Sequence, residues 1–257
     1  AHAGYYYESV TNTRGAGPNS EQKVRGWVEG DNARVEFVTG DRSGPFARGN
    51  YLVTTDGGEN VYLVNPGDET YAAFDLEEMM TTLGQAMEMM EKMGDMVTME
   101  FTDASSEQLL EEPGEAILGF NTTHYRVKSG YTMVMGIMGM NRETRTETVA
   151  DIWSTNDLDD AGFNAWLRPV QRMNTGNDDI DEVLGQQFGM LKGYPLKMVM
   201  ESSSQGAGNS GTTTTTMDVT VLREEPVDDV QFTWPDSYAE IELVPDMEQA
   251  MRDAKKN

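Results

Sequence analysis

The feature that most constrains this chain is a series of short segments, spaced about ten residues apart, in which apolar and polar side chains alternate. Val35 and Phe37, for example, alternate with Arg34 and Glu36 just after a turn at residues 30–32. Alternation of this kind is typical of a strand with one buried face. Such strands, joined by tight turns, predict an antiparallel sheet that curls toward a barrel or half-barrel. The first six segments are residues 4–13, 22–30, 33–40, 50–56, 60–66 and 69–75.

The strand pattern stops at residues 76–99, which hold eight of the nineteen methionines. At 100° per residue, the apolar side chains fall on one stripe and the charged ones fall elsewhere. Asp75 is a suitable N-cap and Gly94 a suitable stop. Residues 76–93 are therefore predicted to form an amphipathic helix of about four to five turns, with its apolar stripe on the sheet. The stripe consists of Leu76, Met79, Met80, Leu83, Met87 and Met90.

Strand patterns return after this predicted helix. We find no repeat and no linker that would divide the chain, so we expect one domain over residues 1–244 and a polar tail or helix at 245–257. In the late segment at 212–225, period-two alternation predicts one inward face formed by Thr213, Thr215, Met217, Val219 and Val221. The returning segments are 96–104, 117–130, 131–141, 145–156, 194–204, 212–225 and 237–244.

A second methionine-rich segment, residues 133–140, is predicted to be a strand that is apolar on both faces. Met133 and Met135 would point to one side, and Met138 and Met140 to the other. The segment is too short to cross a membrane as a helix. Such a strand needs cover on both sides, from the predicted helix or from a partner.

Composition excludes several classes of function. The chain has 44 acidic against 19 basic side chains, a formal charge of −25, which repels nucleic acid and favours basic partners. It has no cysteine, which excludes disulfides, zinc–thiolate sites and thiol nucleophiles. The chain contains no run of eighteen apolar residues, so no membrane-spanning helix is predicted. The first residues are typical of a mature chain after signal-peptide removal, so we expect a periplasmic or extracellular location.

The residues best suited to chemistry are few. His2 and His124 are the only histidines, so a Ser-His-Asp triad or a multi-histidine metal site is hard to build. Residues 157–162 begin like a calcium loop, but Arg168 stands where a bidentate glutamate is required. These acidic residues, like those at 178–179, are better suited to capping helices. We therefore predict no catalytic residue, no metal and no cofactor.

Three roles remain open for the methionines. They can form a core stripe, line a hydrophobic ligand, or supply thioethers to Cu(I). Copper is the weakest of the three interpretations, because helical rise spreads the sulfurs over about 20 Å and Leu76 and Leu83 interrupt them.

Four short motifs spread over most of the chain occur in an order known from one group of envelope proteins. A strand of the pattern "ilG-x-x-t-x-x-Y" is followed by "W-x-s", "G-x-P-L-x-m" and "f-x-x-P-x-x-Y". In this order they resemble the LolA/LolB-like superfamily of bacterial envelope proteins, and most closely an exported branch that is a domain of unknown function. The motifs are residues 117–125, 153–154, 193–198 and 232–238.

The resemblance implies an open, strongly curved antiparallel sheet with helices plugging its concave face around an apolar cavity, in an α+β fold that is mainly β. The first hypothesis is thus a non-enzymatic envelope protein that binds a lipid or acyl-like ligand. The alternatives are an accessory subunit that docks on a larger envelope assembly through a basic partner, a methionine-rich copper-binding protein, and, least expected, an enzyme. The predicted ligand-binding residues are Met79, Met80, Leu83, Met87, Met90, Met133, Met135 and Trp153.

Overall fold

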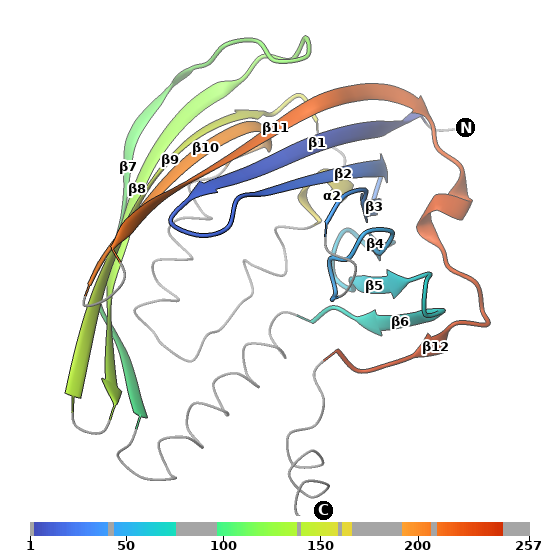
Figure 1. The fold of residues 1–257 in the computed structure, drawn as a ribbon. Coiled ribbons are helices and arrows are strands. Elements are labelled where there is room, and N and C mark those ends of the chain that lie inside the picture. The colour runs from blue at the N-terminus through green and yellow to red at the C-terminus, as the bar shows by residue number, and fades with distance from the viewer. Residues whose placement is uncertain are drawn as a thin grey trace, which may run out of the picture.

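Twelve strands form one sheet that bends into an open arch in this computed structural model (Figure 1). The predicted open, strongly curved antiparallel sheet is confirmed, apart from one short pair of parallel strands at its edge. The helical part of the prediction is not, because the described residues are nearly all strand, turn and loop. The structure describes residues 3–40, 44–75, 97–137, 140–158, 161–165, 192–206 and 210–243.

The N-terminal half of the sheet is an antiparallel meander in which each strand pairs with the next. Its six strands coincide with the six segments predicted from alternation, which shows that period and turn residues were sufficient to locate them. They are β1 (Ala3–Gly15), β2 (Ser20–Glu29), β3 (Asn32–Phe37), β4 (Tyr51–Thr54), β5 (Tyr62–Asn65) and β6 (Thr70–Ala73).

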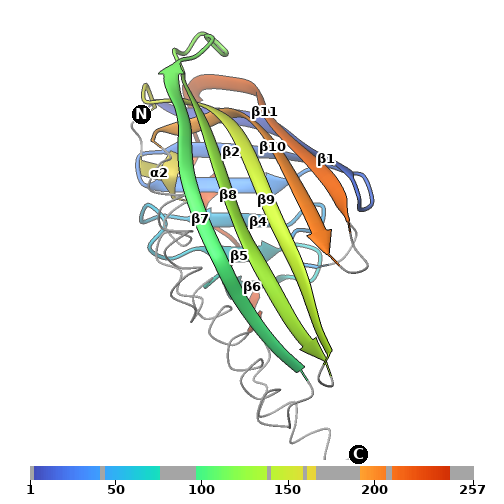
Figure 2. The ribbon, with the colours of Figure 1, turned by 90° about the vertical axis from the view of Figure 1, so that its left-hand side faces the viewer.

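The C-terminal half is a second antiparallel meander of longer strands, seen side by side in Figure 2. Among the described residues the one α-helix, α2 (Ala161–Asn164), is short and follows the third of them. The strands are β7 (Val97–Pro113), β8 (Thr123–Ile137), β9 (Met140–Thr155), β10 (Tyr194–Gly206) and β11 (Gly211–Pro226).

The two meanders become one sheet because β1 pairs with β11 along its whole length. After β11 the chain forms a 3₁₀ turn, η1 (Asp229–Phe232), and returns as β12 (Ala239–Glu240), which pairs with β6 in parallel. The strand order is β12-β6-β5-β4-β3-β2-β1-β11-β10-β9-β8-β7.

We call the face of the sheet that carries α2 the inner face, and Figure 1 shows that it is the concave side of the arch. Phe163 of α2 is buried against Tyr7, Val28 and Val219 of the sheet. Gly162 donates its backbone N–H to the carbonyl of Gly30, which holds α2 against the β2–β3 turn. The outer face of β3–β5 is covered by residues 227–238, whose Phe232 is buried with Tyr51, Val53 and Val64.

The segment predicted as one strand over residues 133–140 is in fact divided between two strands, so that prediction was wrong. β8 ends at Ile137 and β9 begins at Met140, which lies opposite Ile137 and is 65% exposed. The first part of the prediction holds, because Met133 and Met135 share the inner face while Val134 lies on the outer one. The predicted helix at 76–93 and the tail at 245–257 lie outside the described residues.

Candidate functional site

The register of four strands places apolar side chains in rows across the inner face. Tyr125, Ile152, Met198 and Met217 lie opposite one another on β8, β9, β10 and β11. The next row toward the middle of the strands contains Val127, Ala150 and Met200. We call these seven residues the apolar band. Tyr125, Val127, Ala150 and Ile152 are buried, and Met198 and Met200 pack against them as half-buried side chains.

Hydroxyl groups occupy the following rows of the inner face. Thr148 Oγ1 and Ser202 Oγ lie 3.0 Å apart, and Thr146 Oγ1 and Ser204 Oγ lie 3.4 Å apart. β-Branched threonine suits strands, and hydroxyl pairs across strands stabilise their pairing. We call this region the hydroxyl band, and its members are Ser129, Thr146, Thr148, Ser202, Ser204 and Thr213.

Charge is separated between the two faces of these strands. No residue of the apolar or hydroxyl band is charged, although 25% of the chain is Asp, Glu, Lys or Arg. The residues that alternate with them along each strand point to the outer face, and many of these are acidic or basic. We call this arrangement the outer charge lattice. Examples on the outer face are Arg126, Lys128, Arg145, Glu147, Asp151, Lys197 and Glu201. The two bands of the inner face are thus suited to contact with an uncharged molecule, and the outer face is suited to contact with water or charged partners.

Of the predicted ligand-binding residues, only three are described. Met133 and Met135 are half-buried on the inner face, beyond the hydroxyl band. Trp153 lies on the outer face, where its ring stacks on that of His124 at 4.3 Å with 2° between the planes. The sheet therefore separates Trp153 from the two methionines. The other predicted residues lie outside the described residues: Met79, Met80, Leu83, Met87 and Met90.

The outer face around Trp153 holds the polar cluster that most resembles a catalytic arrangement. His124 Nε2 lies 2.7 Å from Asp151 Oδ1, and His124 Nδ1 lies 3.7 Å from a Glu112 carboxylate oxygen. Arg126 donates two hydrogen bonds to Asp151, of 2.8 and 3.1 Å. Partial burial raises the pKa of the Asp151 carboxyl, but the hydrogen bonds from Arg126 and His124 outweigh this effect, so the pKa lies below its usual value.

This cluster is arranged for structure rather than for nucleophilic chemistry. Both ring nitrogens of His124 face carboxylates, whereas a Ser-His-Asp triad needs one of them to face a hydroxyl. Lys197 Nζ lies 4.6 Å above the ring of Trp153 and forms a 2.8 Å ion pair with Glu115. Across residues 3–40, 44–75, 97–137, 140–158, 161–165, 192–206 and 210–243, no group of three or more His, Asp or Glu side chains could hold a metal ion.

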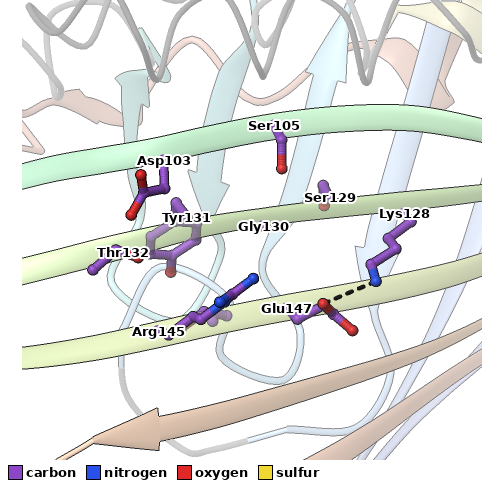
Figure 3. Close-up of a pocket in the computed structure, with 10 residues that line it drawn as sticks. Asp103, Ser105, Lys128, Ser129, Gly130, Tyr131, Thr132, Arg145 and Glu147 are labelled. Carbon is purple, nitrogen blue, oxygen red and sulfur yellow. Dashed lines mark ion pairs between the residues drawn. The ribbon is translucent and has the colours of Figure 1, made fainter.

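A shallow pocket of about 250 Å³ lies over Gly130, where β8 lacks a side chain (Figure 3). Lys128 and Glu147 stand beside it and form a 2.9 Å ion pair between exposed side chains. Exposed pairs of this kind contribute about 0–1 kcal/mol and are screened by salt. The pocket is therefore a notch in the outer charge lattice, formed by a missing side chain.

Sequence reasoning missed the two bands because their rows join strands that are far apart in the chain. Alternation within each strand shows which residues share a face, but it does not show which strand lies next to which. Met198 and Met217, for example, lie opposite each other only because β10 and β11 form a hairpin in this register. The signal that was available is the absence of charge at alternate positions from Thr144 to Ile152.

Fold and site together define a class: an open, strongly curved single-sheet protein with an uncharged band on its concave face and many charges on its convex face. By sequence, the chain belongs to the family described as Domain of unknown function (DUF4412), whose model matches residues 12–238. No curated protein matches the sequence. In the described part of the chain, no helix is long and apolar enough to cross a membrane.

Three solved structures show a distant likeness to the chain. PNGF-II aligns with 96% of this chain at 14% identity and a TM-score of 0.35, and the chain spans only 32% of PNGF-II. A domain from Vibrio parahaemolyticus, described as an outer membrane lipoprotein-sorting protein, aligns with 90% of this chain over 89% of its own length, at 9% identity and a TM-score of 0.32. A DUF1329 family protein from Desulfovibrio piger gives the same coverages, with 8% identity and a TM-score of 0.32. Likeness at this level carries no information on function.

Proposed function

We propose that this protein is a non-enzymatic envelope protein that binds a hydrophobic, acyl-like ligand on the inner face of its arch. The observation that carries the proposal is the separation of charge between the faces: in a chain of net charge −25, the apolar and hydroxyl bands hold no charge. The exported, periplasmic or extracellular setting rests on the LolA/LolB-like motifs described above.

The physical basis is the cost of placing an apolar chain against charges. Burying a methylene group away from water gains about 0.8 kcal/mol, whereas burying a charge without a partner costs far more. The apolar and hydroxyl bands avoid that cost across β8, β9, β10 and β11, whereas beyond them this face carries the charge of Arg142, which lies opposite Met135 near the start of β9. Methionine side chains are flexible, so Met133, Met135, Met198 and Met200 can adapt to acyl chains of different length.

Two neighbouring residues of β8 provide a matched test. Met133 lies on the inner face and Val134 on the outer face, and both are half-buried. We expect Met133→Lys to weaken binding of a neutral pyrene-labelled acyl ester about tenfold or more, because it brings a charge to the inner face. Val134→Lys should change the affinity less than about twofold. Fluorescence titration measures both, with circular dichroism to check the fold.

Equal effects of the two substitutions would remove the inner face as the ligand site. Native mass spectrometry of protein purified from its source gives an independent answer. We expect a bound lipid mass that is lost on organic extraction. A chain that is always free of lipid and that does not bind the acyl ester contradicts the proposal.

A second candidate function, an accessory subunit that docks on a basic partner, is favoured by the edge strand β7. In the described part of the chain β7 pairs only with β8, so its other edge is open. Residues 97–113 contain five acidic side chains and no basic one. An acidic open edge suits a cationic partner. Co-purification at low salt that is lost at about 0.5 M salt would support this function, since exposed charges are then screened.

A further inference from the structure

A pocket of about 470 Å³ lies on the outer face, at the end of the arch opposite β7. It forms where residues 232–238 cross β6, and it is independent of the inner face and of the function proposed above. Most of its lining is aromatic, and one side chain is acidic. The lining residues on which the argument depends are Tyr71, Trp234, Asp236 and Tyr238.

Trp234 is the centre of the aromatic group in this pocket. Its ring lies 4.9 Å from that of Tyr71 and 5.1 Å from that of Tyr62, at angles of 40° and 46°. The parallel pairing of β12 with β6 and a turn from Pro235 to Tyr238 fix the backbone around it. Trp234, Tyr71 and Tyr238 are half-buried, so each ring keeps a part of its surface open to the pocket.

The other aromatic groups of the outer face already carry a cation. The Arg34 guanidinium lies 3.7 Å above the Tyr51 ring, and that of Arg223 lies 4.4 Å above Tyr6. Lys197 lies above Trp153 in the same way. Within the described ranges, no Lys or Arg lies over the rings of Tyr62, Tyr71 or Trp234.

The charged side chains at the open side of the Trp234 pocket are acidic, whereas the nearby Arg34 donates a hydrogen bond to the Gln231 carbonyl and is paired with Glu36. Asp236 lines it with an exposed carboxylate, and the Tyr71 hydroxyl donates a 3.4 Å hydrogen bond to Glu240. Aromatic ring faces attract cations, with tryptophan the strongest, and recognition of quaternary ammonium groups uses such rings. Nearby carboxylates add to this attraction.

We propose that the Trp234 pocket binds a trimethylammonium group, either in a free choline-like molecule or in a lipid headgroup. The cation lies against Trp234 and Tyr71, and Asp236 supplies the counter-charge. A neutral sugar could also stack on the aromatic rings, but it would not need a carboxylate as counter-charge. The charge of the ligand therefore distinguishes a trimethylammonium compound from a sugar.

The first experiment compares choline with its neutral carbon analogue, 3,3-dimethylbutan-1-ol, by isothermal titration calorimetry on the full chain. The two molecules have nearly the same shape and differ in charge. We expect choline to bind at least about tenfold more tightly. Equal affinities, tighter binding of the neutral analogue, or no binding of choline would overturn the proposal.

Variants then locate the binding. Asp236→Asn should weaken choline binding about two- to fivefold, the range of an exposed ion pair. Trp234→Phe should weaken it further, because phenylalanine keeps a ring with a less negative face. The matched control is Asp229→Asn, an exposed acid of η1 outside the pocket. Asp236 is exposed, so its variant tests the site even if Trp234→Phe fails to fold. Wild-type affinity in both variants overturns the proposal.

Vesicles distinguish the two sources of the group. Flotation with phosphatidylcholine vesicles, together with choline binding, supports a lipid headgroup as the source. Binding of free choline without flotation supports a soluble quaternary amine. Flotation that persists in Asp236→Asn, without binding of free choline, shows membrane association elsewhere and overturns the proposal.

Discussion

Asp151 connects two strands through its hydrogen bonds to Arg126 and His124, and its side chain is only 19% exposed. Its pKa is lower in the folded protein than in an unfolded chain, so at acid pH the unfolded chain binds more protons. The stabilisation from this carboxylate is therefore complete above the unfolded-state pKa of about 3.9 and is lost as the pH falls through the lower folded-state pKa.

Asp151→Asn should reduce the free energy of unfolding by about 1–2 kcal/mol at pH 7, because charge-assisted hydrogen bonds from partly exposed donors are lost. The difference from wild type should shrink below about pH 4. Urea unfolding at several pH values measures it. Glu201→Gln on the same face is the control, since Glu201 is exposed. A difference that is constant down to pH 2 would contradict the assignment.

The sequence did not predict the partner of His124 or the face of the sheet on which Trp153 lies. The two histidines of the chain predict no multi-histidine metal site, and nothing near His124 in the sequence identified Asp151 as its partner. The two residues are 27 positions apart and meet only through the β8–β9 register. Trp153 was predicted to line the ligand-binding cavity. Trp153 is two positions from Asp151 on β9, so both side chains lie on the outer face.

At the scale of elements, one inserted residue changes the inward face of β11. Period two predicted Val221 on the inner face, after Val219. The register shifts there: Glu8 lies opposite Val221 and Ser9 opposite Val219, so Thr220 is an extra residue. Beyond this bulge it is Leu222 that packs against the buried cluster of Tyr7. A β-bulge has no reliable sequence signature, because it depends on the partner strand.

β7 is longer than the sequence predicted. The prediction ended this strand at residue 104, yet it continues to Pro113. Residues 105–113 are polar or acidic apart from Leu109, Leu110 and Pro113, and the two adjacent leucines do not form the apolar alternation by which strands were located. Pairing with β8 makes them a strand, since backbone hydrogen bonds do not depend on side-chain polarity.

The predicted helix at 76–93 supplies an element-scale prediction from sequence alone. Met80→Leu and Met87→Leu should preserve the fold, each costing less than about 1.5 kcal/mol, because volume is nearly conserved. Asp at either position should destabilise the protein strongly if the stripe is buried. Thermal unfolding measures both sets of variants. If the Leu variants instead lose a stoichiometric copper ion that the parent chain holds, copper binding replaces the core interpretation.

At the scale of the whole molecule, the formal charge of −25 acts on stability. Like charges repel within the folded protein, and salt screens them as the Debye length falls from about 30 Å at 0.01 M to about 10 Å at 0.1 M. We expect Tm to rise over this range, by about 2–4 °C for each 1 kcal/mol gained. Calorimetry in sodium and in potassium chloride should give the same rise. A fall in Tm would show that attractive pairs dominate.

The sequence alone determined the six strands of the N-terminal meander, the acidic character and the absence of cysteine, because these depend on composition and on short-range period. It also indicated which residues of each strand share a face. The tertiary structure decided the rest. The pairing of β1 with β11, about 200 residues apart, converts two meanders into one arch. Only that pairing, with its registers and bulge, places uncharged side chains from separate strands on one concave face, since contacts between distant segments depend on the whole fold.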